Sequence, residues 1–341
     1  MMKLNRLFMT TVVLFAFAST NCFAQGPNDS GTYYQNADGK KGAALKTALC
    51  AVINPHTQRT YKQLWDDFKK TDAKPNGKVW DMYSNKKEFT FGTDQAGSYS
   101  KEGDVYNREH SFPKSWFNDE YPMYTDLFHL YPTDGWVNGQ RGNDPFGEAG
   151  PGYKSSANEF SKWGSAKSDL GYSGKVFEPN DEYKGDFART YFYMVTAYET
   201  YKVNGNGATK QITSWNCPML DGKTYPGLSD WALNMLLKWA KQDPVSEKEI
   251  NRNNTVYGIQ NNRNPFIDYP GLEEYIWGDK KDMAFSYDNY STTDIEDLFE
   301  DVQNDEPEAI YSPDGRRLEK MQRGLNIVRT KSRRTIKVIV K

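Results

Sequence analysis

The sequence predicts an α+β fold, with a mostly helical domain built around a short strand–strand–helix unit and a small β-rich C-terminal tail. Three observations predict it. Apolar residues recur at helical spacing in several segments between residues 43 and 260. Between residues 106 and 141, two strand-like runs and a proline turn lead into a helix. Near the C-terminus, Ile and Val alternate with polar residues, which is the two-residue period of a strand.

The first 24 residues have the form of a secretory signal. Lys3 and Arg6 precede a short apolar run, after which the residues become small and polar. Such a run is too short and wrongly flanked for a stable membrane span, and we expect cleavage after Ala24. Lipidation at Cys22 is the weaker alternative, because the residues before it are a poor lipid-attachment context. No other run is apolar enough to cross a membrane. We therefore expect a secreted or cell-surface protein.

The domain from residue 25 to 280 is predicted to be mostly helical. Apolar residues at helical spacing mark four helices, and the capping-box sequence at 246–249 opens a fifth. These predicted helices are 43–53, 61–68, 186–201, 229–241 and 246–260. The segments 79–83 and 89–91 are predicted to be short strands. The Gly-, Ser- and Lys-rich segment 147–174 is predicted to be a long surface excursion.

Opposite charges gather in two blocks near the C-terminus that cancel each other, and the whole chain has a net charge of −2. Residues 292–308 contain eight acidic residues and no basic one, whereas 309–341 contain ten Lys and Arg against two acidic residues. We interpret 281–308 as an acidic linker and 309–341 as the β-rich tail. The overall charge gives no signal for nucleic acid, and the basic tail is equally consistent with a solvated surface.

Two cysteines, Cys50 and Cys217, remain if Cys22 leaves with the signal. An oxidising compartment permits a disulfide between them, but the sequence does not show whether they meet. Both alternatives stay open, and a metal site from two cysteines so far apart in the sequence is not expected.

The residues best suited to catalysis or metal binding lie between positions 106 and 148. This stretch holds two of the three histidines, the pair Glu109-His110, and Asn138 on a predicted helix. After His110 the chain must double back through a second strand near 127–131, and Pro132 then opens the helix that presents Asn138. Two strands and a helix would thus surround one cation.

Phosphodiester hydrolysis fits these residue types. The reaction needs a proton acceptor for water and positive charge at the phosphorane and the leaving oxygen. A neutral histidine accepts a proton near pH 7. Mg²⁺ prefers oxygen ligands and keeps several waters. Glu109 offers a carboxylate oxygen and Asn138 a carbonyl oxygen, while His110 and His129 are both candidates for the proton acceptor.

The pair Glu109-His110 raises a geometric difficulty. Adjacent residues of a regular strand point to opposite faces, so both side chains cannot face one metal from an ideal strand. We therefore expect a turned or bulged backbone at this pair. Pro113 fits a strand that ends directly after it.

Several motifs resemble the bacterial endonuclease I family of periplasmic and secreted nucleases, whose members have a ββα-metal (His-metal) finger. The finger is resembled by EH-x-x-P, by DLFHLYP with an asparagine six residues after its proline, and by RGN. Further blocks resemble family segments in family order: FEPNDEYKGDFARTYFYM, LLKWAKQDPVSEKEINRN and IQNNRNPFIDYP. The resemblance covers roughly residues 26–278.

The resemblance implies roles for the residues of the finger. His110 matches the general base that activates water, Glu109 the carboxylate metal ligand and Asn138 the carboxamide ligand. His129 lies between Phe128 and the apolar Leu130, and we interpret it as a structural residue or as one that supports the site without contacting the substrate. The implied cofactor is Mg²⁺, with Mn²⁺ and Ca²⁺ as alternatives. No organic cofactor is expected.

Arginines in the family blocks are candidates for contacts with nucleic acid, namely Arg108, Arg141, Arg252 and Arg263. Arg141 can either support a phosphate or hold the finger together. For Arg252 and Arg263 the alternative is a structural network in which the guanidinium groups bind loop carbonyls. The sequence leaves these alternatives open.

The sequence and the resemblance together predict a secreted, Mg²⁺-dependent, largely sequence-non-specific endonuclease acting on DNA and, as a second candidate, RNA, with 5′-phosphate products. Nucleic acid is the expected partner, and the expected state is a monomer. The tail resembles C-terminal sorting domains of type IX secretion cargo, which implies contact with secretion machinery. Two rival functions are a secreted glycoside hydrolase, suggested by the many aromatic residues and carboxylates, and a non-catalytic nucleic-acid-binding surface protein.

Overall fold

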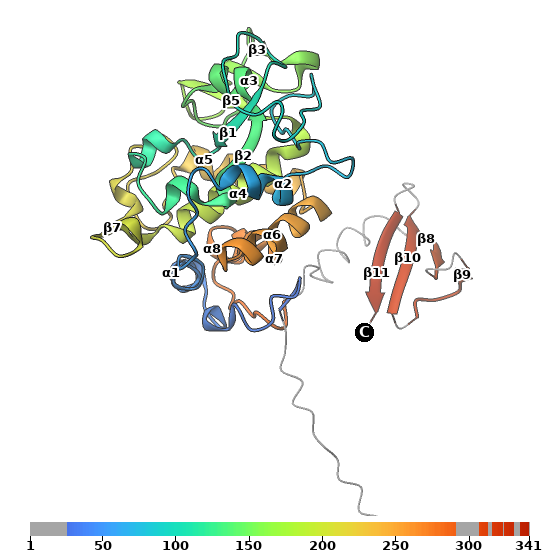
Figure 1. Cartoon of the computed structure of the whole chain (residues 1–341). Coiled ribbons are helices and arrows are strands. Elements are labelled where there is room, and N and C mark those ends of the chain that lie inside the picture. Colours follow the sequence, from blue (N-terminus) through green and yellow to red (C-terminus); the bar gives the residue numbers. More distant parts are fainter. Residues whose placement is uncertain (1–25, 291–306, 313–315, 323, 331–334, 341) are drawn as a thin grey trace, which may run out of the picture.

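The structure is a computed structural model that describes residues 26–290, 307–312, 316–322, 324–330 and 335–340 (Figure 1). The predicted signal at 1–24 and most of the predicted acidic linker at 281–308 lie outside the described residues. The division of the chain into signal, nuclease domain, linker and tail therefore stays a prediction. Among the described helices, none has the length and the apolar character that crossing a bilayer requires.

Helices make up most of the regular secondary structure between residues 26 and 290. The α-helices are α1 (Gly42–Ile53), α2 (Leu64–Thr71), α3 (Gly135–Arg141), α4 (Lys184–Ala197), α5 (Asp230–Gln242), α6 (Glu247–Gln260), α7 (Pro265–Asp268) and α8 (Leu272–Ile276). All five helices predicted from apolar spacing or capping are present, and none of their ends is shifted by more than four residues. The capping box at Ser246 forms as predicted, because the Ser246 side chain accepts from the Glu249 N–H and the Glu249 side chain accepts in return.

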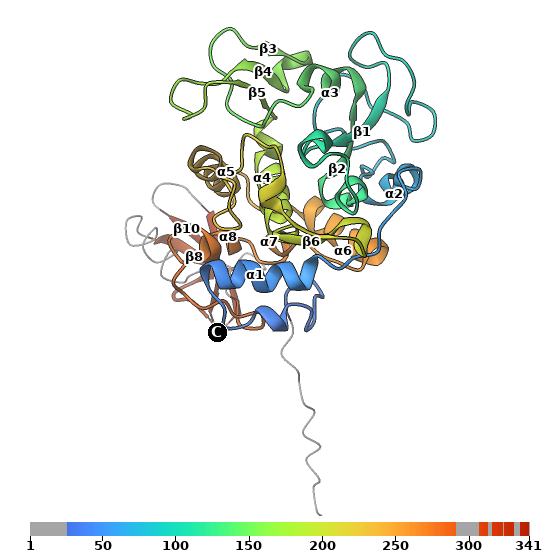
Figure 2. The same ribbon diagram turned by 90° about the vertical axis from the view of Figure 1, so that its left-hand side faces the viewer.

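The centre of the helical body is α4, and every one of its 14 residues is buried. In Figure 2, α4 runs through the middle of the molecule, with α5 beside it and α1 crossing below. Its aromatic side chains, including Phe187, Tyr191 and Phe192, pack into the hydrophobic core. The predicted aromatic core helix is therefore confirmed.

The strands form small antiparallel sheets. They are β1 (Tyr106–His110), β2 (Leu130–Asp134), β3 (Lys154–Ser155), β4 (Lys162–Ser165), β5 (Lys175–Glu178), β6 (Thr200–Lys202), β7 (Thr209–Gln211), β8 (Pro307–Tyr311), β9 (Arg317–Leu318), β10 (Gly324–Thr330) and β11 (Thr335–Val340). The excursion at 147–174 carries β3 and β4, which continue into a three-stranded sheet with β5. The tail contains a four-stranded sheet of order β11-β10-β8-β9.

The predicted strands at 79–83 and 89–91 are wrong. This segment contains only an isolated bridge between Ala73 and Val79. The backbone turns because the Asp81 carboxylate accepts the N–H groups of Tyr83 and Ser84, at 2.8 and 3.3 Å. The apolar residues that suggested strands instead fill a small cluster in which Val79 and Phe89 pack against Tyr106.

Asp134 joins the sheet of β1 and β2 to α3. It is the last residue of β2, and its Oδ1 accepts the N–H groups of Trp136 and Val137 at 2.9 and 3.0 Å, which caps the helix. Its Oδ2 accepts from the Gly103 N–H at 2.7 Å and so fastens the preceding loop to the same point. Gly142, with φ +58°, ends the helix after seven residues.

We expect Asp134→Ala to lower the free energy of unfolding by about 1–2 kcal/mol, because a helix this short loses its only side-chain cap. Urea unfolding followed by circular dichroism measures the change. Asp134→Asn keeps an accepting oxygen and is the matched control, expected to lose less. Equal stabilities of the two variants would contradict the role of Asp134 as the cap.

Candidate active site

The predicted strand–strand–helix unit is present at residues 106–141. The two strands pair antiparallel in unbroken register, from Tyr106 opposite Asp134 to His110 opposite Leu130. Helix α3 follows β2 without a gap, and Figure 1 shows the three elements together in the upper part of the molecule. The second strand begins later than predicted, at Leu130, because residues 127–129 form a 3₁₀ turn capped by the Asp126 side chain. We refer to residues 106–141 as the finger.

The predicted irregularity at Glu109-His110 is wrong. Register is regular through His110, and the next N–H, of Ser111, still donates to the His129 carbonyl at 2.9 Å. Strand alternation therefore places the two side chains on opposite faces of β1, and their contacts agree. Glu109 meets Tyr83 and α3, whereas His110 meets tyrosines of the preceding and following loops.

Glu109 is buried in a polar cluster on the α3 side of β1. Its Oε1 accepts from the Tyr83 hydroxyl at 2.8 Å and forms an ion pair with the Arg141 guanidinium. The Asn138 side chain is a further hydrogen-bonding neighbour of the carboxylate. Burial raises the pKa of the Glu109 carboxyl, while Arg141, Tyr83 and Asn138 oppose that shift by favouring the ionised form.

Asn138 lies beside Glu109 on the second turn of α3. Its Nδ2 donates to the Asn107 Oδ1 at 2.7 Å, and both asparagines are half-buried. The two predicted metal ligands are thus brought together, with one carboxylate and one carboxamide at the same place. This oxygen set fits Mg²⁺, which proteins often hold through one or two carboxylates while it keeps several waters. No group of three or more His, Cys, Asp or Glu suited to a metal occurs in the described part of the chain.

His110 is held on the other face of β1. Its Nε2 lies 3.0 Å from the Tyr124 carbonyl oxygen. Because a carbonyl only accepts, Nε2 carries the hydrogen and Nδ1 keeps the lone pair. The ring stacks on Tyr124 and Tyr61, with centroids 5.1 and 6.2 Å away. Burial, reinforced by His129 nearby, holds the pKa of His110 well below its ordinary value, so the imidazole is neutral at pH 7.

The other two histidines have structural surroundings. His129 is fully buried behind His110, with its Nε2 2.7 Å from the Met123 carbonyl oxygen and its ring centroid 5.5 Å from that of His110. His56 lies in the loop after α1, where its Nδ1 is 2.8 Å from the Asn54 carbonyl oxygen. Of the three histidines, only His110 lies on a strand beside the Glu109 cluster.

Arg108 lies on the same face of β1 as His110, two residues earlier. Its guanidinium carbon is 3.5 Å from the centroid of the Tyr61 ring and 4.3 Å from that of Trp65. Its Nη1 donates to the Tyr61 carbonyl at 2.7 Å. The side chain is only half-buried, and no carboxylate ion pair holds it among the described residues. Arg108 is therefore a cation available beside His110.

Arg141 is an interior residue. It is 1% exposed and binds Glu109, the Tyr83 hydroxyl and, through Nη2, the Ser111 carbonyl at 2.7 Å. These partners come from β1, from the segment after it and from the loop at residue 83. Of the two roles considered for Arg141, its geometry favours holding the finger together.

Arg252 and Arg263 are also interior, and their geometry favours the structural alternative over a contact with nucleic acid. Arg252 pairs with Asp72 at 2.8 Å and donates to the carbonyls of Leu127 and Leu130, both at 2.8 Å. Arg263 pairs with Asp268 at 2.7 Å and is 2% exposed. Neither guanidinium is free to meet a phosphate.

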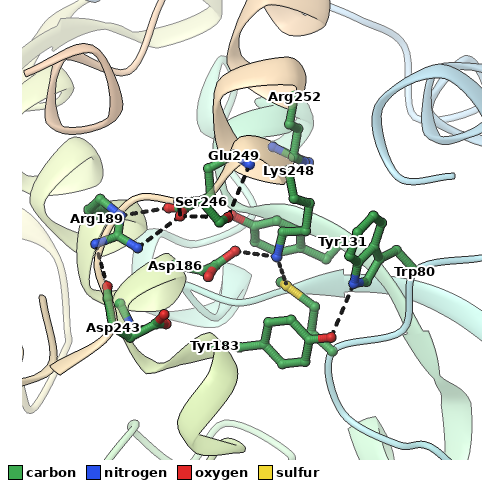
Figure 3. A network of polar contacts seen from close by, with 12 residues as sticks. Trp80, Tyr131, Tyr183, Asp186, Arg189, Asp243, Ser246, Lys248, Glu249 and Arg252 are labelled. Carbon is green, nitrogen blue, oxygen red and sulfur yellow. Dashed lines mark hydrogen bonds and ion pairs between the residues drawn. The ribbon is translucent and has the colours of Figure 1, made fainter. Parts of the chain in front are cut away.

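The interior network around Arg252 ties the helical body to the finger. Figure 3 shows Arg252 on α6 near Tyr131 of β2, and Arg189 of α4 beside Glu249. Arg189 binds the Glu249 carboxylate through Nε and Nη2, at 2.6 and 2.9 Å. The same carboxylate caps α6, so α4, α6 and β2 are linked by buried charges.

Sequence reasoning missed two residues of the site. Asn107 lies two positions before Glu109, so strand alternation alone places it on the Glu109 face. Tyr83 lies 26 residues before Glu109 in the sequence. No spacing rule connects them, because the contact depends on the turn that Asp81 forms.

We expect Arg252→Met to lower the free energy of unfolding by about 3–5 kcal/mol, because Asp72 would be left as an uncompensated buried charge. Urea denaturation measures this. The double variant Asp72→Asn/Arg252→Met is the matched control and is expected to recover part of the loss. If Arg252 instead contacts phosphate, stability would stay unchanged and the salt dependence of nucleic-acid binding would weaken by about one charge.

Comparison with known proteins identifies relatives across the finger and the helical body. The family model of endonuclease I matches residues 41–271. An extracellular ribonuclease of Bacillus amyloliquefaciens is 38% identical over 260 residues, covering 73% of this chain and 79% of the relative. One of Bacillus subtilis (strain 168) is 35% identical over 261 residues, with the same coverage. An endonuclease-1 of Buchnera aphidicola subsp. Acyrthosiphon pisum is 26% identical over 143 residues, covering 42% of this chain and 44% of the relative.

Proposed function

Because the chain belongs to the endonuclease I family and is a nuclease, we propose that it is a secreted, Mg²⁺-dependent endonuclease that hydrolyses phosphodiester bonds with little dependence on sequence. DNA is the first candidate substrate. RNA is the second, since two relatives carry the name extracellular ribonuclease. The family assignment favours this function over a glycoside hydrolase or a non-catalytic binding protein.

The observation that carries the proposal is the placement of His110, Glu109 and Asn138 at one end of the finger. His110 offers a neutral imidazole whose Nδ1 has a free lone pair. Glu109 and Asn138 offer adjacent oxygen ligands. Together they supply a proton acceptor and a cation site within one short unit.

In this proposal His110 removes the proton from the attacking water. The Tyr124 carbonyl fixes the ring orientation by accepting from Nε2, and it stabilises the charged ring after Nδ1 takes the proton. Glu109 and Asn138 would hold Mg²⁺, which when bound supplies positive charge to the phosphoryl oxygens and the leaving oxygen. Tyr83 and Arg141 hold Glu109 in place by binding its Oε1. The expected products carry 5′-phosphate ends.

The regular strand restricts where the substrate lies. Tyr106 uses its backbone N–H and C=O to bind Asp94 and Ala96, on the edge of β1 opposite β2. Side chains from both faces of β1 border this outer edge. A phosphate beside the outer edge at the end of β1 is reached by Glu109 from one face and by His110 from the other. We infer that the scissile phosphate lies there.

Arg108 is the residue we propose for binding a neighbouring phosphate. It lies one strand repeat before His110 on the same face, and Tyr61 and Trp65 support its guanidinium. A phosphate contact of this kind carries no sequence information, which agrees with a non-specific nuclease. It also makes binding weaken as the salt concentration rises.

Export is the remaining part of the proposal. The signal at 1–24 would direct the chain out of the cytoplasm, and the tail at 309–341 would act as a type IX sorting address with 281–308 as its spacer. The names of two relatives include the word extracellular, which supports secretion.

The monomeric state likewise stays a proposal. Cys50 and Cys217 are both buried free thiols, so no disulfide joins them.

We expect His110→Ala to lower the cleavage rate by about 10²–10⁴-fold, because the water loses its general base. Cleavage of supercoiled plasmid and of RNA, each with Mg²⁺, Ca²⁺ or EDTA, measures the rate and the substrate together. His56→Ala is the matched control, since His56 is a half-buried loop histidine outside the finger, and it is expected to cleave at the wild-type rate. Full activity of a folded His110→Ala variant would refute the assigned role.

We expect Asn138→Ala to raise the Mg²⁺ concentration required for half-maximal activity, because one of two protein ligands is lost. Activity measured across a magnesium titration, with calorimetry of Mg²⁺ binding, tests this. Gln140→Ala is the control on the same helix, where the side chain is exposed. An unchanged titration for Asn138→Ala would remove Asn138 from the metal site.

A further inference from the structure

The ring of Tyr99 lies across the outer side of α3, the helix that carries Asn138. It is 41% exposed, which makes it one of three exposed large hydrophobic side chains in the described part of the chain. A Cβ added at Gly135 would come within 3.1 Å of the Tyr99 Cδ1. A Cβ added at Gly139 would come within 2.9 Å of its hydroxyl and 3.4 Å of its Cε2. The ring therefore rests on both glycines and presents its other side to solvent.

The two glycines are explained by this contact. Neither Gly135 nor Gly139 has a positive φ, so the backbone does not require glycine at these positions. Glycine inside a helix costs about 1 kcal/mol relative to alanine, and α3 has only seven residues to share that cost. What glycine provides here is room for the Tyr99 ring against the helix backbone.

The loop that carries Tyr99 is firmly attached to the finger. The Asp104 carboxylate accepts the N–H groups of Ser100 and Lys101, at 2.8 and 3.1 Å. The Gly135 N–H donates to the Val105 carbonyl at 2.9 Å. Together with the bond from Gly103 to Asp134, these contacts attach the segment directly after Tyr99 to the finger. Tyr99 still leaves 41% of its surface exposed, so burial of apolar area accounts for only part of its placement.

The ring is close to the proposed metal ligand. Residues three and four apart on a helix are neighbours on its surface, so Asn138 and Gly139 both flank Gly135. Tyr99 thus covers helix positions that border Asn138, on the helix that faces Glu109. The next residue but one, Lys101, is an exposed cation. An exposed ring beside a phosphate site, with a cation nearby, is the combination that binds unpaired nucleotides.

We propose that Tyr99 is a stacking platform for the nucleobase next to the scissile phosphate, and that the enzyme consequently prefers unpaired strands of DNA or RNA. This inference rests on the proposed function. Stacking on an aromatic side chain accepts every base, because every base has a π-face. A base inside a duplex is already stacked on its neighbours and cannot offer that face without being unstacked.

The test compares Tyr99→Ala, Tyr99→Phe and wild type on a single-stranded DNA oligonucleotide, the same sequence as a duplex, and the RNA equivalent. Stacking is worth about 1–3 kcal/mol per base, so Tyr99→Ala is expected to lower kcat/KM on both single strands by about 5–150-fold, mainly through KM. Tyr99→Phe keeps the ring and is expected to behave as wild type. The duplex is expected to be cleaved more slowly by wild type and to be little affected by either substitution.

A second readout does not depend on turnover. In the His110→Ala background, a single strand containing 2-aminopurine is expected to lose fluorescence on binding, and Tyr99→Ala is expected to abolish that loss. Tyr257→Ala is the matched control, because Tyr257 is 40% exposed but lies on α6. Thermal melting checks that each variant is folded.

The possible failures are distinguishable. If wild type cleaves and Tyr99→Ala matches it on single strands, the platform is refuted and the nuclease function stands. An equal loss on single strands and duplex refutes the preference for unpaired bases. If wild type cleaves none of the substrates, or His110→Ala cleaves as well as wild type, the proposed function fails and the platform fails with it.

Discussion

The ion pair between Glu109 and Arg141 is the interaction on which the finger depends. Both residues are buried, and the pair joins the C-terminal end of β1 to the last turn of α3. A buried ion pair costs desolvation that its attraction barely repays, so it is poor evidence for added stability. Its contribution here is to hold the Glu109 carboxylate in one orientation. Arg141 and Tyr83 bind one oxygen of the Glu109 carboxylate, which fixes the direction in which the other oxygen points.

The position of the finger in turn depends on buried charges of the helical body. Arg252 binds the carbonyls of Leu127 and Leu130, which are the residues at which the 3₁₀ turn and β2 begin. Without that support, the buried Leu130 carbonyl would lose the Arg252 donor, and the Leu127 carbonyl would keep only the Leu130 N–H. Tyr131, the second residue of β2, lies under the Arg252 guanidinium and bonds Thr190 of α4. The register of the finger is therefore set partly by the core helices, through contacts far apart in the sequence.

Elements with strong local patterns were predictable from the sequence, and features that depend on long-range contacts were not. The aromatic spacing of α4 and the Ser246 capping box predicted helices that are present. The strands expected at 79–83 are absent, because the Asp81 side chain competes for the backbone there. Arg252 and Arg263 suggested phosphate binding by residue type, but only the fold shows that Asp72 and Asp268 already occupy them. The places of His110 and Asn138 on the finger were predictable because the resemblance covers their spacing, and their roles stay predictions. Tyr83 and Tyr99 come from loops whose course no local pattern encodes.

The bond between His110 and the main-chain carbonyl of Tyr124 has a consequence for turnover. Nε2 is bonded to that carbonyl, so in the proposed role Nδ1 must both accept and release the proton in every cycle. As the proposed general base, His110 would not relay protons from one side of the ring to the other, and it would release its proton only after the reaction products leave Nδ1. Since the accepting oxygen belongs to the backbone, any side chain at position 124 would supply it. In the proposed role, the direction of proton transfer at His110 is therefore set by the main chain at residue 124 and not by its side chain.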